Sequence, residues 1–201
     1  MSQVVPEKLG VTDLVTARLG TEQFKPIQRP KDAVGVGGEV HAKLWRPDPE
    51  TGALFLAQYE YGFNLVTDYG DEHLGERVYD DTFTIVTGMR LGTGVTAAAK
   101  AGAGAAIVTY EPASQEALDA VPVGVDKGAG LGWRVPHICT WVAGDVTEVA
   151  LAEVVLTDET PITDVAGVVG DTVARFVFGS TIDKQAGDSL VVTWNIDLLG
   201  A

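Results

Sequence analysis

The stretch from Ala174 to Leu198, ARFVFGSTIDKQAGDSLVVTWNIDL, decides the fold class of this chain. In it, two runs of β-branched and aromatic residues alternate with polar residues, and a linker rich in Gly, Ser and Asp joins them. Alternation with a period of two residues is typical of half-buried antiparallel strands rather than helices. The sequence therefore predicts a pair of strands here. The second run places four apolar side chains on one face, which we expect to lie in the core: Leu190, Val192, Trp194 and Ile196.

Two more pairs of runs predict hairpins. Val40–Trp45 alternates, and a second alternating run, Leu54–Tyr61, follows a loop that contains proline and glycine. Farther along, Trp133–Ala143 and Thr147–Leu156 flank the dipeptide Gly144-Asp145. Because Gly and Asp favour tight turns between antiparallel strands, we expect the second pair to form a hairpin as well.

The remaining chain adds one strand signal and few helix signals. Thr82–Val86 predicts a strand, whereas helix patterns are confined to Val11–Leu19, Asp71–Tyr79 and Ser114–Ala120. Seven or eight strands with so little helix predict an all-β fold, namely an antiparallel β-sandwich or barrel-like domain with one or two short helices. Trp141, inside one of the predicted strands, is expected to be a further core anchor.

Residues 1–37 differ from the rest, and we interpret them as an extended N-terminal arm that precedes a β-sandwich domain at residues 38–201. After the helix pattern at Val11–Leu19, the stretch 24–38 shows no period and contains Pro26 and Pro30, which lack the N–H donor that a sheet requires. Two interpretations stay open: a loose terminus, or an arm that lies on a neighbouring subunit. In the second case, the partner contacts are expected from Phe24, Pro26, Ile27 and Arg29.

Charge is distributed unevenly along the chain. Lys and Arg number 14 against 28 Asp and Glu, a net charge of −14, whereas residues 1–46 carry seven basic and five acidic residues. An acidic body repels phosphate backbones, so we expect no nucleic-acid partner. The first ten residues lack the apolar segment of a signal peptide, and the chain has no run of about 20 apolar residues, so we expect no export signal and no membrane partner.

No motif in the sequence predicts a metal or cofactor. Cys139 lies two residues from His137, but His41 and His73 stand apart, so the three or four ligands that zinc requires are not grouped. We therefore interpret Cys139 as a buried structural thiol. The acidic residues at 68–72 and 80–81 lack the alternating spacing of calcium loops, which makes solvated acidic surface the preferred interpretation.

The glycine-rich segment 88–104, GMRLGTGVTAAAKAGAG, does not match a phosphate-binding loop. It lacks the third glycine of the dinucleotide fingerprint and the Gly-Lys-Ser or Gly-Lys-Thr of a P-loop, so we expect a flexible loop. No histidine lies in a recognisable nucleophile motif either. We therefore expect that the protein is not an enzyme.

Several short patterns, taken in order, resemble those of small structural proteins of tailed bacteriophages. They cover roughly Glu39 to Leu198 and comprise Asn64-Leu65-Val66 with Gly70, Leu91–Ala97, Glu148–Leu151, Ala174–Phe178 and Gly187–Trp194. The resemblance implies a virion protein that is assembled in the host cytoplasm and acts through its surface. It implies a homo-oligomeric head decoration (cement) protein bound to the major capsid protein or another virion protein.

The arm lies outside that pattern but suits a decoration role, because cement proteins often clamp neighbouring capsid subunits with extended termini. A tail, baseplate or fibre-associated protein is the closest alternative. An alternative from another class is a carbohydrate-binding module, in which exposed tryptophans would line a sugar groove. The chain has four tryptophans, and their positions in alternating runs favour core or interface roles: Trp45, Trp133, Trp141 and Trp194.

Overall fold

The computed structural model describes residues 35–80, 84–128 and 131–199. Within these ranges, strands make up 48% of the residues, and the fold has one α-helix and two antiparallel sheets of five strands each. The predicted all-β sandwich is therefore confirmed. The predicted helix Val11–Leu19 and the arm residues before Gly35 lie outside the described residues.

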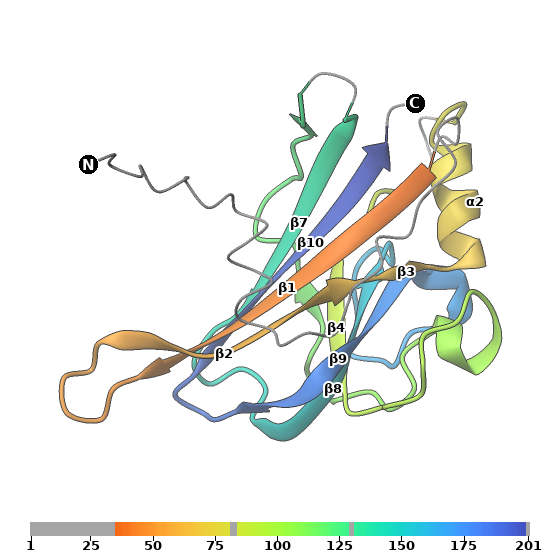
Figure 1. Cartoon of the computed structure of the whole chain (residues 1–201). Helices are drawn as coiled ribbons and strands as arrows, with labels where there is room; N and C mark the ends of the chain where they lie inside the picture. Colours follow the sequence, from red (N-terminus) through yellow and green to blue (C-terminus); the bar gives the residue numbers. More distant parts are fainter. Residues whose placement is uncertain (1–34, 81–83, 129–130, 200–201) are drawn as a thin grey trace, which may run out of the picture. The chain divides into compact units, whose positions relative to one another are not determined.

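The first sheet has the strand order β2-β1-β10-β7-β6, and the second has the order β3-β9-β8-β4-β5 (Figure 1). The strands of the first sheet are β1 (Gly35–Pro47), β2 (Leu54–Phe63), β6 (Val125–Asp126), β7 (Trp133–Trp141) and β10 (Ser189–Leu199). Those of the second are β3 (Leu65–Val66), β4 (Gly88–Gly92), β5 (Glu116–Ala117), β8 (Glu148–Thr157) and β9 (Thr172–Lys184). Helix α2 (Asp68–Glu76) and the 3₁₀ turns η1 (Gly102–Ala105) and η2 (Val169–Asp171) complete the fold.

The core lies between the two sheets, and β10 is central to it. This strand pairs with β1 on one side and with β7 on the other, so that Val40, Trp194 and His137 lie side by side. Alternate residues of β1 and β10 point into the core, as their sequence pattern predicts. The five predicted anchors are all at most 3% exposed: Trp141, Leu190, Val192, Trp194 and Ile196.

Two of the three predicted strand pairings are wrong, although the strands exist. The β1–β2 hairpin is confirmed by its antiparallel register. However, β9 lies in the second sheet whereas β10 lies in the first, and β7 and β8 are likewise in opposite sheets. The connections at Gly144-Asp145 and before Ser189 therefore cross from one layer to the other. Sandwiches commonly join successive strands in this way, and a turn motif alone does not distinguish a crossing from a hairpin.

Three local predictions differ from the structure. Of the strand expected at Thr82–Val86, residues 82 and 83 lie outside the described residues and residues 84–86 form no strand, whereas β4 lies inside the segment that was expected to be a flexible loop. The expected helix at Ser114–Ala120 is replaced by β5, because the buried Ser114 hydroxyl donates to the Leu91 carbonyl and accepts from its amide, which draws this segment to the edge of β4. At the N-terminal boundary, β1 starts at residue 35 and pairs with the end of β10, so residues 35–37 belong to the sheet rather than to the arm.

Helix α2 covers one end of the sandwich. Thr67 caps the helix, since its hydroxyl accepts a hydrogen bond from the Gly70 amide at 2.9 Å. A Cβ at Gly70 would lie 2.0 Å from the carbonyl oxygen of Val173, so glycine lets the helix approach β9 closely. This contact holds the inner face of α2, with His73, over the open end of the core. No helix in the described ranges is long and apolar enough to cross a bilayer.

Candidate functional site

The outer face of the first sheet carries a row of exposed aromatic side chains, which we call the aromatic ladder: Tyr59, Tyr61 and Phe63 on β2. Their rings are 46%, 47% and 72% exposed, respectively. His41 on β1 supports the ladder, because its ring centroid is 4.9 Å from that of Tyr61 and its Nδ1 is 2.6 Å from the Tyr59 hydroxyl. Within the described residues, the ladder side chains stay about half exposed or more. The ladder is therefore a pre-ordered aromatic surface that is open to a partner.

The β1–β2 hairpin extends the ladder beyond the body of the sandwich (Figure 1). In its outer part, Leu54, Phe55 and Leu56 are all about half exposed or more, at 61%, 46% and 45%. We call these three residues the hairpin stem. The register of β1 and β2 shifts between Leu44 and Trp45, and the stem residues beyond this shift are exposed on both faces of the hairpin. A contiguous patch of large exposed apolar side chains often marks an interaction surface.

The projecting hairpin is held in a defined position at both ends. At the tip, the Asp48 carboxylate accepts hydrogen bonds from the amides of Glu50 and Thr51. At the base, Arg46 donates to both carboxylate oxygens of Asp188 at 2.7 to 3.2 Å. Bidentate pairing of this kind fixes direction as well as distance. The stem is thus presented by a rigid scaffold.

The outer face of the second sheet, in contrast, is covered by loops that buried polar groups attach to the sheet. Glu153 and Arg175 are both fully buried and form an ion pair, with Arg175 Nη2 2.8 Å from Glu153 Oε2. The other carboxylate oxygen of Glu153 accepts from the amides of Gly94, Val108 and Thr109 at 2.9 to 3.0 Å. Gly94 of the glycine-rich segment, together with Val108 and Thr109 a few residues after it, therefore directs its N–H group at a carboxylate of the same chain.

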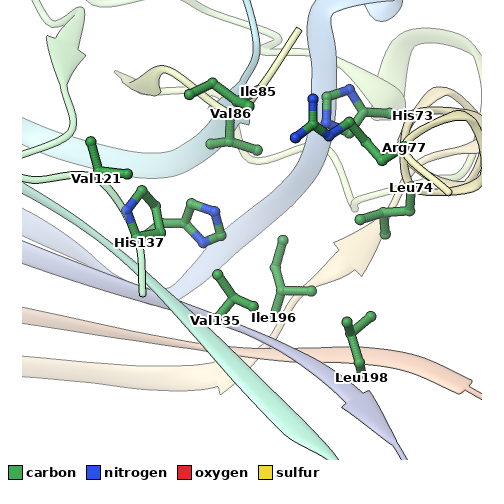
Figure 2. Close-up of a pocket in the computed structure, with 11 residues that line it drawn as sticks. His73, Leu74, Arg77, Ile85, Val86, Val121, Val135, His137, Ile196 and Leu198 are labelled. Carbon is green, nitrogen blue, oxygen red and sulfur yellow. The ribbon is translucent and has the colours of Figure 1, made fainter. Parts of the chain in front are cut away.

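A cavity of about 400 Å³ lies between helix α2 and the inner face of the first sheet (Figure 2). Its walls are mostly aliphatic, and three nitrogen-bearing side chains line it: His73, Arg77 and His137. Figure 2 shows the imidazole of His137 pointing from β7 into this space, opposite the two side chains from the helix. Exposed rim residues, among them Val121 and Leu198, open the cavity to the surface.

The two histidines of the cavity differ in their surroundings. His73 Nδ1 is 3.0 Å from Asp158 Oδ2, which also accepts from the hydroxyls of Tyr69 and Thr84. Burial raises the pKa of Asp158, but these hydrogen bonds outweigh it and hold the pKa below its ordinary value. His137 is 5% exposed, and burial lowers its pKa to about 4, so the ring is neutral at pH 7. The backbone groups of Trp194 on β10 and of Val135 on the same strand lie near that ring, yet its buried Nδ1 has no hydrogen bond of ordinary geometry.

The described residues contain no group of three or more His, Cys, Asp or Glu side chains that could hold a metal ion. Cys139 lies in the core, where burial raises the pKa of its thiol and makes it unreactive. The acidic residues at the start of α2 are exposed, and Asp71 pairs with Lys100. The buried position of Cys139 agrees with its interpretation as a structural thiol.

The predicted site residues fall into two groups: the core anchors, which the structure describes, and the arm residues, which it does not. The five core anchors lie between the sheets, whereas Phe24, Pro26, Ile27 and Arg29 lie outside the described residues. The sequence reasoning missed the surfaces that we describe above. Three consecutive apolar residues beside a Pro- and Gly-containing loop were a signal for the exposed stem, whereas the cavity depends on residues too distant in sequence to suggest it.

No protein-family model, no curated protein and no solved structure matches this chain. Function must therefore be inferred from the surface and the cavity of the chain itself.

Proposed function

We propose that this chain is a structural protein of a bacteriophage virion, most concretely a head decoration protein that binds the capsid shell as a homo-oligomer. The observation that supports this proposal is the hairpin stem, which presents three exposed apolar side chains on a rigid projection. Such a surface suits a permanent protein contact, because burying a large apolar side chain contributes roughly 1.5 to 3 kcal/mol. The resemblance of the ordered sequence patterns to phage structural proteins supplies the kind of assembly.

The charge of the chain is consistent with this role. With a net charge of −14, copies in free solution repel one another, whereas a contact through an apolar surface offsets that repulsion locally. The stem and the ladder lie on one edge of the first sheet, so both can face the same partner. Partners on a particle would be the major capsid protein or another copy of this chain.

The first prediction tests the stem. Replacing Leu54, Phe55 and Leu56 together by serine should lower binding to undecorated capsids by about tenfold or more, since that loss corresponds to only about 1.4 kcal/mol. Co-sedimentation of purified full-length chains with capsids measures it. The matched control replaces three exposed valines on separate loops, Val95, Val123 and Val168, by serine. Equal binding by the stem variant and the control variant would remove the stem from the interface.

The second prediction tests the arm. Deleting residues 2–34 leaves β1 complete, because its pairing with β10 begins at Gly35. We expect the body to stay folded and capsid binding to fall by about tenfold or more. Phe24→Ala should reproduce part of that loss, because aromatic anchors often dominate interfaces. If full-length and truncated chains co-sediment equally, the contact belongs to the β body alone.

A carbohydrate-binding module is a second candidate, and the aromatic ladder favours it. Tryptophans do not, because Trp141 and Trp194 are fully buried and only Trp133, at 53%, is largely exposed. Tyr59 and Tyr61 are about half exposed, and aromatic side chains of this kind can contact sugar rings. Retention on immobilised host polysaccharide that Tyr61→Ala abolishes, together with no binding to capsids or tails, would establish this function in place of the virion role. Binding to tails and not heads would place the protein there.

A further inference from the structure

We propose that two copies of this chain associate through β2, edge to edge and antiparallel, so that their first sheets join into one continuous sheet. The proposed function leaves two partners for the stem and the ladder, namely the capsid protein and another copy of the chain. The dimer rests on that proposed function for its homo-oligomer, and it assigns this surface to the second copy. Four features of β2 support it: an edge position, a symmetric row of apolar side chains, little charge and a sufficient exposed area.

β2 lies at the edge of the first sheet, and among the described residues its only strand partner is β1 (Figure 1). Its inward-facing side chains are already used within the chain. Gln58 Nε2 donates to the Thr181 carbonyl at 3.0 Å, and Glu60 Oε2 accepts from the Ser180 amide at 3.2 Å. Side chains of β2 thus occupy backbone groups of β9. An edge strand itself presents a row of backbone groups to which a strand of another molecule can be added.

The apolar side chains on the outer face of β2 form one continuous row. Val40, Ala42 and Leu44 of β1 point into the core, so the residues between them face outward. Their partners on β2 change from odd to even positions where the register passes over Ala57. These partners, which we call the outer row, are 45% to 72% exposed: Leu54, Leu56, Tyr59, Tyr61 and Phe63. The outer row therefore joins the ladder to two residues of the stem on a single face.

The outer row is symmetric about Tyr59, because two of its members lie on each side of this residue in the register. A second copy that pairs antiparallel, with its Tyr59 opposite Tyr59, places Tyr61 opposite Leu56 and Phe63 opposite Leu54. The ladder of each copy then faces the leucines of the other. Cross-strand contacts between large side chains stabilise antiparallel sheets of this kind. The outer row is thus complementary to a second copy of itself.

The charge of β2 also favours a second copy. The chain carries a net charge of −14, so two copies associate most readily where few acidic groups meet. β2 contains one charged residue, Glu60, whose carboxylate accepts hydrogen bonds from Gln58 and from the Ser180 amide. In the antiparallel register centred on Tyr59, Glu60 lies opposite the uncharged Gln58 of the second copy. No two like charges are therefore directly opposite, an arrangement that would destabilise the pair.

The exposed area of the outer row matches the lower range of specific interfaces. At roughly 200 Å² for a large side chain, the exposed parts of the row amount to roughly 500 Å² per copy, or roughly 1,000 Å² for two copies. Specific interfaces bury about 1,200 Å² or more, and the main chain of the two strands would supply the remainder. A contact of this size is expected to be reversible, with a dissociation constant on the order of 10 μM.

The test is sedimentation-velocity ultracentrifugation of the full chain, without capsids, from about 1 to about 300 μM. We expect a monomer–dimer equilibrium. Tyr59→Glu should weaken the dimer by about tenfold or more, because it places two carboxylates directly opposite each other at the symmetry axis. The matched control is Val95→Glu, which adds the same charge at a position that is 74% exposed on a loop of the second sheet. This variant should dimerise like the native chain.

Cross-linking tests the register. Cys139 is the only cysteine of the chain and is fully buried, so Tyr59→Cys introduces a single accessible thiol. Mild oxidation should convert this variant to a disulfide-linked dimer, because directly opposite residues of paired strands lie close enough for a disulfide. Lys43→Cys, exposed on β1, should stay monomeric under reducing-free denaturing electrophoresis. Three strand spacings, roughly 14 Å, would separate its two thiol-bearing residues in the dimer.

Three results would overturn the dimer: a chain that stays monomeric at the highest concentration, a dimer that Tyr59→Glu leaves unchanged, or cross-linking of Lys43→Cys without cross-linking of Tyr59→Cys. Failure of the dimer differs from failure of the proposed function. A monomer that co-sediments with capsids would refute the dimer alone and assign β2 to the capsid protein. A dimer that binds neither capsids nor tails would refute the virion role alone.

Discussion

Arg175→Met should be strongly destabilising, with a loss of about 3 to 5 kcal/mol in the free energy of unfolding. Arg175 is fully buried and its guanidinium contacts the equally buried carboxylate of Glu153 through Nε at 2.9 Å and Nη2 at 2.8 Å. The substitution would leave a buried carboxylate without its counter-charge. It would also remove the hydrogen bond from Arg175 Nη1 to the Gly104 carbonyl, which attaches the glycine-rich loop to the sheet. Urea denaturation followed by tryptophan fluorescence measures the loss.

The matched control is Lys100→Met, since Lys100 pairs with Asp71 where both side chains are about half exposed, at 50% and 51%. Exposed ion pairs contribute about 1 kcal/mol or less, so this variant should be nearly as stable as the native chain. The double variant Glu153→Leu, Arg175→Met should lose less than the two single losses added together, because neither charge is then buried alone. A loss below about 1 kcal/mol for Arg175→Met would show that the covering loop opens and admits water to the pair.

The same ion pair shows where sequence reasoning reached its limit. The period of two residues identified β1, β7, β8, β9 and β10 and the core face of β10, because alternation reports local burial. On β8 and β9, however, Glu153 and Arg175 are buried on the outer face, where Glu153 accepts from the amides of Gly94 and Val108. The sequence around Glu153 does not indicate that this polar residue will be covered by a loop 45 residues away.

Pairing between strands was harder to predict for a related reason. A turn such as Gly144-Asp145 reverses the chain in a hairpin and in a crossing between layers alike, so the sequence near the turn does not decide between them. Which strands pair is decided by the other strands that compete for the edges of β10. β10 has β1 on one side and β7 on the other, and each offers nine or more paired residues in register. With both edges of β10 occupied, β9 forms its ladder with β8 in the opposite sheet.

The cavity could not be predicted from the sequence either, because the residues that line it are far apart in the chain. His73 and His137 stand 64 positions apart in sequence, and each alone is typical of a core or surface histidine. Only the placement of α2 over the end of β7 brings them to one space. The hairpin stem, by contrast, is visible in the sequence as three consecutive apolar residues, but the sequence does not show that all three are exposed.

Trp194→Ala should cost about 3 to 5 kcal/mol, the usual loss when a large aromatic side chain is removed from a core. Trp194 is fully buried on the central strand of the first sheet, between Val40 of β1 and His137 of β7 in the register. No residue in these strands can fill the volume that its ring vacates, because the strands on both sides are fixed by their hydrogen-bond ladders. Chemical denaturation of the purified variant measures the change.

Trp133→Ala is the control for this prediction, because it removes the same side chain from a position that is 53% exposed at the start of β7. The loss there should be about 1 kcal/mol or less, since surface substitutions rarely cost more. Trp194 also has a buried indole N–H without a hydrogen-bond partner in the described structure, so Trp194→Phe removes an unpaired donor together with part of the volume. It should therefore be clearly more stable than Trp194→Ala. Equal stability of Trp194→Ala and Trp133→Ala would mean that β10 presents its other face to the core, since a shift of one residue exchanges the two faces of a strand.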